Sequence, residues 1–350
     1  MERGKEQTAE RPAEPTFFDL PGSVQAAAWI CLGFAGFVVW DQYAWWTRRD
    51  DYSFGFLVPL FVGYVLFDRW PRIRAVLTCG KPAEADAGAP GGEPETEPRP
   101  APGWLRGLAT ALFGAAFLLG LLSFGFGALL RATQGPQNAA SLAVAWGFAW
   151  FLVATVFLFG DRDARGRPIR LGPRLALTGM FLFPAFIWLI SAPLLSFLER
   201  NLSLFLLDKV AGTVFSVFDL LGIPIAKEGN VLFLGFLEDG TRNEVMVEDA
   251  CSGIRSLMAC LFAGSFLGAV FMKPFWKKVL LVGLAMLLAF LTNILRSFFL
   301  TYWAYAHGSH SIQGVVHDVT GYAVLGLTCI GLIALLPLIN FRYSDWKSVV

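Results

Sequence analysis

The chain has 350 residues, of which 55% are hydrophobic and only 16% are charged, and its mean hydropathy is +0.56. Soluble domains carry about 25% charged residues, so a soluble protein of this length could not hide so much apolar surface. The net charge of +1 argues against a nucleic-acid partner. A lipid bilayer can surround apolar helix faces, and the composition therefore predicts an integral membrane protein.

Apolar runs separated by short polar segments predict about eight transmembrane helices, within one either way. Most runs approach the roughly 20 residues that a spanning helix needs, although the second is short and the fifth contains Pro184. No small-residue cleavage site follows the first run, which predicts a transmembrane helix rather than a cleavable signal. The runs are residues 23–40, 53–67, 104–130, 139–160, 175–195, 256–272, 279–300 and 320–340.

Two long segments lack the character of spanning helices. Residues 80–103 contain Pro, Gly, Ala and Glu without a large apolar side chain, which predicts a disordered linker. Residues 196–222 are apolar but are interrupted by charges, which are costly in hydrocarbon, so we expect amphipathic helix at the membrane interface. The charges are Glu199, Arg200, Asp208, Lys209 and Asp219.

Residues 223–249 change character again. The runs 231–234 and 244–247 are β-prone, and the turn signal Glu238-Asp239-Gly240 lies between them. We expect a small hairpin outside the bilayer.

Basic residues predict the orientation of the helices. With eight spans, four basic clusters fall on one side, and the preference of basic loops for the cytoplasm identifies that side. Arg48 and Arg49 lie on the other side, where Asp41, Asp50 and Asp51 offset them weakly at best. The cytoplasmic clusters contain Arg69, Arg72, Arg74, Arg162, Arg165, Arg167, Arg170, Arg174, Lys273, Lys277, Lys278, Arg342 and Lys347.

This topology puts three polar sites, distant in sequence, on the outer side. Cys251 precedes the sixth helix, Arg296 lies near the outer end of the seventh, and His317 precedes the eighth. A helix N-terminus or a nearby cation lowers the pKa of a cysteine and favours its reactive thiolate. A histidine can protonate a leaving amine and then deprotonate an acceptor, and an arginine can stabilise an oxyanion. The three side chains together suit acyl transfer.

Neighbouring residues are candidates for supporting the reaction or binding the substrate, and each has a simpler interpretation as well. A lone cysteine is more often structural, an arginine at a helix end can be a snorkelling anchor, and a His-Asp pair can be a helix cap. One turn after Cys251, Arg255 could equally contact a lipid headgroup. The supporting candidates are Glu248, Ser252, Arg255, Asn293 and Asp318.

The remaining cysteines and histidines predict neither a cofactor nor a metal. The cysteines form no CxxC pair. A metal site from His307, His310 and His317 has to be considered, but no HExxH motif or Cys/His spacing supports it.

Three motifs resemble the signature motifs of the exosortase/archaeosortase family. The stretches 222–231 and 52–60 are also similar to family segments, although many members have histidine where this chain has Phe54. The resemblance covers roughly residues 40–340, with 80–103 as an insertion. The motifs are EDACSGIRSL at 248–257, NILR at 293–296 and HDVTG at 317–321.

The resemblance implies a membrane-embedded cysteine transpeptidase, convergent with soluble sortases. Such an enzyme is expected to recognise membrane-anchored proteins by a C-terminal motif, a transmembrane helix and a basic tail, and to pass them to a surface glycan or lipid acceptor. The matching positions imply Cys251 as nucleophile, Arg296 as transition-state stabiliser and His317 as acid/base. A transporter, a protease that only hydrolyses, and a non-catalytic component of surface polysaccharide or protein export stay open as alternatives.

Together these features predict an all-α polytopic protein of the cytoplasmic (inner) membrane, with an outward-facing active site. We also expect the sixth to eighth helices to bracket a lateral opening for the substrate's helix, with Gly264, Ser265 and Gly268 permitting close approach. The expected divisions are a cytoplasmic tail (1–22), two transmembrane helices (23–79), a disordered cytoplasmic linker (80–103), three transmembrane helices (104–195), an outer amphipathic and hairpin region (196–250), three catalytic transmembrane helices (251–340) and a cytoplasmic tail (341–350).

Overall fold

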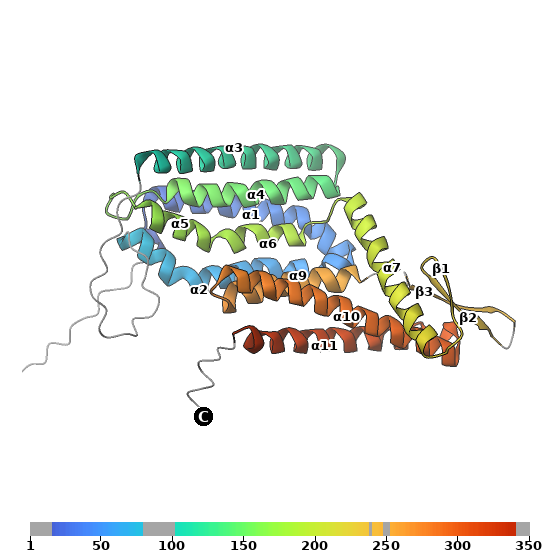
Figure 1. Ribbon diagram of the computed structural model, residues 1–350. Helices are drawn as coiled ribbons and strands as arrows, with labels where there is room; N and C mark the ends of the chain where they lie inside the picture. The colour runs from blue at the N-terminus through green and yellow to red at the C-terminus, as the bar shows by residue number, and fades with distance from the viewer. Residues whose placement is uncertain (1–15, 80–101, 238–239, 248–252, 341–350) are drawn as a thin grey trace, which may run out of the picture.

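The computed structural model describes residues 16–79, 102–237, 240–247 and 253–340. Long helices lie side by side in a bundle, and a small sheet projects beyond one end (Figure 1). The helices are α1 (Gly22–Arg48), α2 (Val58–Cys79), α3 (Gly103–Gln134), α4 (Asn138–Phe159), α5 (Leu171–Met180), α6 (Leu182–Ser191), α7 (Ser196–Leu220), α9 (Ile254–Phe271), α10 (Phe275–His307) and α11 (Val315–Asn340), with the 3-10 helices η1 (Phe17–Asp19), η2 (Asp50–Leu57) and η3 (Ser309–Ile312).

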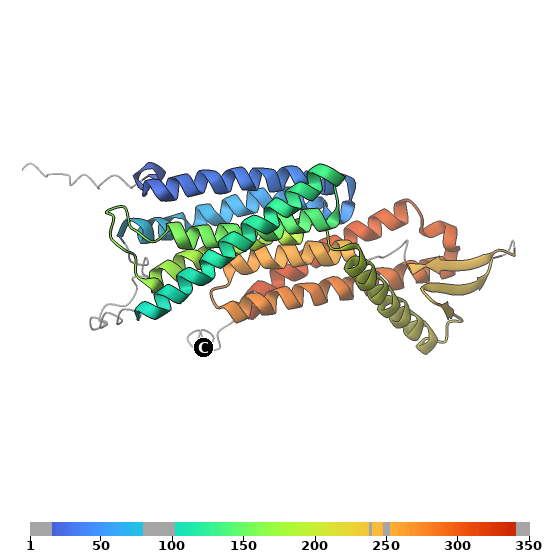
Figure 2. The same cartoon turned by 90° about the horizontal axis from the view of Figure 1, so that it is seen from above.

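The described part contains nine helical segments long and apolar enough to cross a membrane, which confirms the predicted all-α polytopic class. One of the nine is α7, the segment whose charges predicted an interfacial position. Figures 1 and 2 show α7 inclined across one end of the bundle rather than aligned with the other helices. The number of apolar segments in the described part, nine, thus equals the sum of the eight expected spans and the expected amphipathic helix.

The fifth predicted span is broken into α5 and α6 at Phe181. Pro184 explains the break, because proline has no N–H and its ring clashes with the carbonyl four residues earlier. That carbonyl belongs to Met180, and it accepts a hydrogen bond from the buried Arg69 of α2 instead. Arg69 also donates to the carbonyl of Ala269 in α9, at 3.3 Å. A buried cation thus compensates for the interrupted helix and joins three helices.

The connections with the predicted basic clusters meet at one end of the bundle. The α4–α5 and α9–α10 connections, the end of α2 and the end of α11 all lie at the left of Figure 1, and α7 and the sheet lie at the right. The charge pattern thus agrees with the arrangement of the helices. The greater part of the expected linker, residues 80–101, lies outside the described residues.

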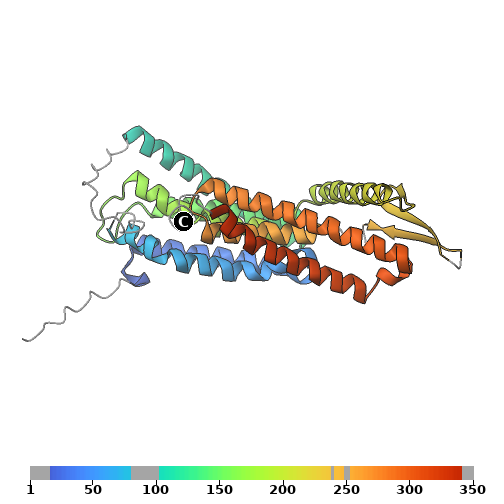
Figure 3. The same cartoon turned by 60° about the horizontal axis from the view of Figure 1, so that its bottom comes forward.

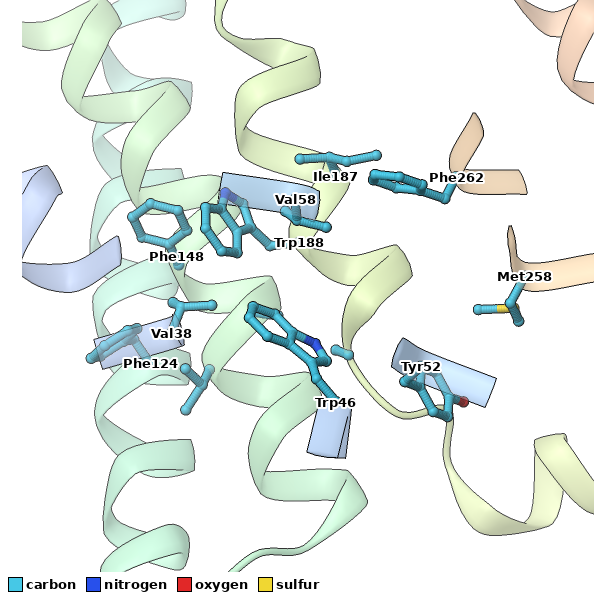
Figure 4. Close-up of a cluster of buried hydrophobic side chains, with 13 residues drawn as sticks. Val38, Trp46, Tyr52, Val58, Phe124, Phe148, Ile187, Trp188, Met258 and Phe262 are labelled. Carbon is cyan, nitrogen blue, oxygen red and sulfur yellow. The ribbon is translucent and has the colours of Figure 1, made fainter. Parts of the chain in front are cut away.

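An aromatic cluster joins α1, α2, α3, α4 and α6 to α9. It includes Trp46 of α1, Tyr52 of η2, Phe148 of α4, Trp188 of α6 and Phe262 of α9, all buried (Figure 4). Polar atoms inside this region are bonded: the Trp46 indole donates to the Ser191 carbonyl, and the Tyr52 hydroxyl accepts from the Leu194 amide. This cluster fixes the bundle on which α9 and α10 rest.

The sheet beyond the bundle has three antiparallel strands in the order β1-β2-β3. β2 (Val231–Phe236) and β3 (Arg242–Met246) are the expected hairpin, and β1 (Ala226–Glu228) adds a strand that was not predicted. The turn residues Glu238 and Asp239 lie outside the described residues. Apolar side chains of β2 and β3 alternate in burial and pack against α7 and α10. The sheet is thereby attached to the long helix that carries Arg296.

Candidate active site

Arg296 and His317 meet at the end of the bundle near the sheet. They are 21 residues apart in sequence, on the neighbouring helices α10 and α11, and the Arg296 Nη2 atom lies 3.0 Å from His317 Nε2. The Arg296 Nε atom is buried and has no hydrogen-bond partner among the described residues. The structure therefore brings together two of the three predicted catalytic side chains and leaves one guanidinium donor available.

The ring of His317 is held on its other side by its neighbour. His317 Nδ1 lies 3.4 Å from Asp318 Oδ1, and the Asp318 side chain is 70% exposed. A charge pair with so exposed a partner contributes little to stability. The role of Asp318 is therefore to orient the imidazole ring of His317. The Thr320 hydroxyl donates to the His317 carbonyl at 2.9 Å and ties this residue into the first turns of α11.

The length of α10 separates Arg296 widely from the first residue of the helix. At 1.5 Å per residue, the helix rises about 32 Å from its first residue, Phe275, to Arg296. The hydrocarbon core of a bilayer is about 30 Å thick. The distance along α10 between Phe275 and the Arg296–His317 contact thus matches the thickness of the hydrocarbon core, and further turns of α10 follow Arg296.

Asn293 connects this pair to the start of α9. Asn293 lies one turn before Arg296 on the same helix, and it is 6% exposed. A Cβ atom at Gly253, the residue that precedes α9, would lie only 2.7 Å from Asn293 Nδ2. Gly253 also has a φ of +64°, which favours glycine. The chain just before α9 is thus pressed against α10 beside Arg296. Cys251, Glu248 and Ser252 lie outside the described residues.

Arg255 is bound to the connection between α1 and α2. Its guanidinium donates to Asp50 at 2.8 Å and lies 3.7 Å from Asp51. Asp51 also lies 3.6 Å from Arg49, which binds Glu199 of α7. The Glu199 hydrogen bond raises the pKa of Arg49. The positive charge of Arg49, just after α1, is therefore neutralised by a long-range partner that the sequence pattern did not indicate.

The small residues expected to admit a substrate helix contact α10 instead. A Cβ atom on Gly264 would lie 3.0 Å from the Cβ of Ala285, and one on Gly268 would lie 3.5 Å from Cα of Lys278. Both glycines are buried. The expectation that Gly264 and Gly268 permit close approach of a substrate helix was wrong, because α10 packs against both of them.

The histidines outside the pair have structural surroundings. The His307 ring stacks on Trp303 with a centroid distance of 4.3 Å, and the Phe54 ring packs on Phe262 at 5.2 Å. Among the described residues, no group of three or more His, Cys, Asp and Glu side chains is placed to hold a metal ion.

The fold and this pair define a polytopic membrane protein with a polar site at one end of its helices. A family model described as transmembrane exosortase (Exosortase_EpsH) matches residues 45–334. The chain belongs to this family, and membership supports a sorting transpeptidase-type role in general. No curated protein and no solved structure matches the chain.

Proposed function

We propose that this protein is a cysteine transpeptidase that cleaves a C-terminal sorting signal of membrane-anchored surface proteins and transfers them to an acceptor through a thioester. Cys251 is the nucleophile, Arg296 stabilises the transition state and His317 transfers protons. The substrates end in a short motif, a transmembrane helix and a basic tail, and the acceptor is a surface glycan or lipid.

The observation that carries this proposal is the 3.0 Å contact between Arg296 and His317 beside the start of α9. Cys251 is two residues from Gly253, so covalent geometry keeps their Cα atoms within about 7 Å. Gly253 itself is packed against Asn293, one turn from Arg296. This short separation along the chain supports the proposal that Cys251 acts together with Arg296 and His317.

The proposed reaction has two acyl-transfer steps. The Cys251 thiol gives its proton to His317, and the thiolate attacks the carbonyl carbon of the scissile peptide bond while Arg296 stabilises the oxyanion. The C–N bond breaks, and His317 returns the proton to the leaving amine, which leaves a thioester. An acceptor hydroxyl or amine then loses its proton to His317 and attacks the thioester. The C–S bond breaks, and the released thiolate recovers the proton.

The site faces outward in this proposal, and the basic connections face the cytoplasm. The preference of Arg and Lys for cytoplasmic loops supports this orientation. Cysteines placed at the exposed Glu228 of β1 and Arg162 of the α4–α5 connection provide the test. A membrane-impermeant maleimide should label the first in intact cells and the second only after permeabilisation, and the reverse pattern refutes the orientation.

The test of the reaction uses a co-expressed reporter with the C-terminal tail of a protein from the same genome that ends in a motif, an apolar helix and a basic tail. Cys251→Ala and Cys251→Ser should abolish cleavage, since a serine hydroxyl is far less acidic than a thiol. Cys260→Ala, which changes a buried cysteine of α9, is the matched control and should process normally. In the parent protein, a hydroxylamine-sensitive adduct with the reporter should form. Normal cleavage by Cys251→Ala would refute the proposal.

A further inference from the structure

Asn243 interrupts an otherwise apolar face of the sheet. Along β3, Asn243 and Val245 point inward with Val247 just beyond the strand, and the residues between them are exposed. Asn243 is 5% exposed. A buried amide is costly unless its donor and acceptor are both satisfied, so an apolar side chain would be the simpler occupant of this position.

Both polar atoms of the Asn243 side chain bind the turn that follows α10. Its Nδ2 donates to the Ala304 carbonyl at 3.1 Å, and its Oδ1 accepts from the Ser309 amide at 2.9 Å. We call these three residues the Asn243 clamp. Ala304 is in the last turn of α10, and Ser309 begins η3, so one side chain joins both sides of the turn.

The backbone around the clamp is specialised in two places. Gly308, inside the turn, has a φ of +86°, which favours glycine. Opposite Asn243, the register of β2 shifts between Phe233 and Gly235, so that the strand has an extra residue there. Bulges of this kind re-aim a neighbouring side chain. Both features serve the same contact between the sheet and the turn.

The turn determines where His317 lies. After Ser309, η3 ends at Ile312, and Ile312 and Val316 pack against the buried Leu300 of α10. α11 then begins at Val315 and runs back alongside α10 (Figure 3). This places His317 beside Arg296. Only this turn connects the helix of Arg296 to the helix of His317 along the chain.

We propose that Asn243 is a positioning residue, and that it holds the α10–α11 turn so that His317 Nε2 stays in contact with Arg296. The importance of that contact for catalysis rests on the proposed function, but the contact itself is measurable without substrate. β3 also leads along the chain toward Cys251. One buried amide therefore links the strand before the nucleophile to the turn before the acid/base residue.

The test measures how fast diethyl pyrocarbonate modifies His317 in the full-length protein in membranes, by mass spectrometry at pH 8, where an ordinary imidazole is neutral. The reagent attacks a free ring nitrogen, and the hydrogen bond from Arg296 protects Nε2. Asn243→Leu should raise the His317 rate about tenfold, the effect of losing one hydrogen bond to a charged group. Asn243→Asp keeps the acceptor for Ser309 and should give a smaller rise.

A double-mutant comparison separates positioning from general loosening. Arg296→Met should raise the His317 rate as Asn243→Leu does, and the double variant should exceed Arg296→Met by less than about twofold. Val245→Ala removes packing from the same strand face but keeps both hydrogen bonds of the Asn243 clamp, and its rate should equal that of the parent. A parental rate in Asn243→Leu, or effects that multiply in the double variant, would overturn the inference. The proposed function stands or falls separately, on cleavage by Cys251→Ala.

Discussion

The helix pair α3–α4 and the helix pair α10–α11 are both antiparallel neighbours, but they touch in different ways. In the first pair, glycines let the backbones meet: a Cβ atom on Gly147 would lie 2.3 Å from the Phe124 nitrogen, and one on Gly120 would lie 2.7 Å from the Phe151 nitrogen. In the second pair, side chains make the contact, through the 3.1 Å Thr292–Thr328 hydrogen bond and the Arg296–His317 pair.

The difference separates a helix pair that stabilises the bundle, α3–α4, from the helix pair that carries the candidate site, α10–α11. Backbones in direct contact leave no room for sliding, whereas side chains can change rotamer and let two helices adjust. The α3–α4 pair is held by close backbone contact, and Arg296 and His317 lie on a pair held by side chains. In the proposed reaction, the substrate enters and the products leave at this second pair. Substitutions in α3–α4 should therefore lower stability, whereas substitutions of the polar pair in α10–α11 should lower activity.

The largest expected effect is on stability, from Gly147→Leu. The added side chain would meet the backbone of α3, which cannot move aside as a flexible side chain can, so the free energy of unfolding should fall by at least about 3 kcal/mol. Gly114→Leu on α3 is the matched control, because a Cβ atom there meets nothing within 4 Å. Thermal unfolding in detergent measures both. Equal midpoints for the two variants would show that α3–α4 is not rigid.

The next effect is on activity alone, from Arg296→Lys. Lysine keeps the charge but lacks the planar guanidinium that contacts His317 and leaves Nε available, so reporter cleavage should fall about a hundredfold while the unfolding midpoint stays constant. Arg200→Lys, on an exposed position of α7, should cleave normally. A destabilised Arg296→Lys protein would mean that the pair holds the fold rather than serving the reaction.

The smallest effect should come from Thr328→Val. It removes one interhelical hydrogen bond with little change in shape, and such bonds contribute about 0.6 kcal/mol in membrane proteins. Thr110→Val on α3 loses only a bond to its own helix and should be near neutral. If Thr328→Val were as destabilising as Gly147→Leu, the contrast between the two helix pairs would not hold.

Most of the fold could be predicted because hydropathy reports depth in the membrane. It predicted the helices and, through strand alternation, the β2–β3 hairpin, and the interfacial position of the 196–222 segment stays a prediction. β1 was missed because Ala-Lys-Glu has no apolar alternation, and these residues become a strand only by pairing with β2. Pro184 explains the break between α5 and α6. The hydrogen bonds of Arg69 that compensate for it could not be predicted, because they join residues far apart in the sequence.

The site was predictable in part for the same reason. Counting spans places Arg296 and His317 on one side of the membrane, and the structure brings them into contact. Hydropathy does not tell which face of a helix meets a neighbour, since lipid-facing and protein-facing surfaces are similarly apolar. The Gly264 face was therefore assigned to the substrate when it belongs to α10. Arg255 with Asp50, 205 residues away, and Asn243 with the α10–α11 turn depend on tertiary contacts with no local signal.

The unbroken length of α10 fixes the distance between Arg296 and the first residue of that helix. A single helix of 33 residues runs from the basic end of the bundle to the sheet, so the height of Arg296 above Phe275 is set by covalent geometry and not by a flexible loop. In the proposed reaction, the same bilayer fixes the position of the substrate's transmembrane helix. In the proposed reaction, cleavage is then selected by the distance between the scissile bond and that anchor. Lengthening or shortening the anchor would move the bond past the site even when its recognition motif is unchanged.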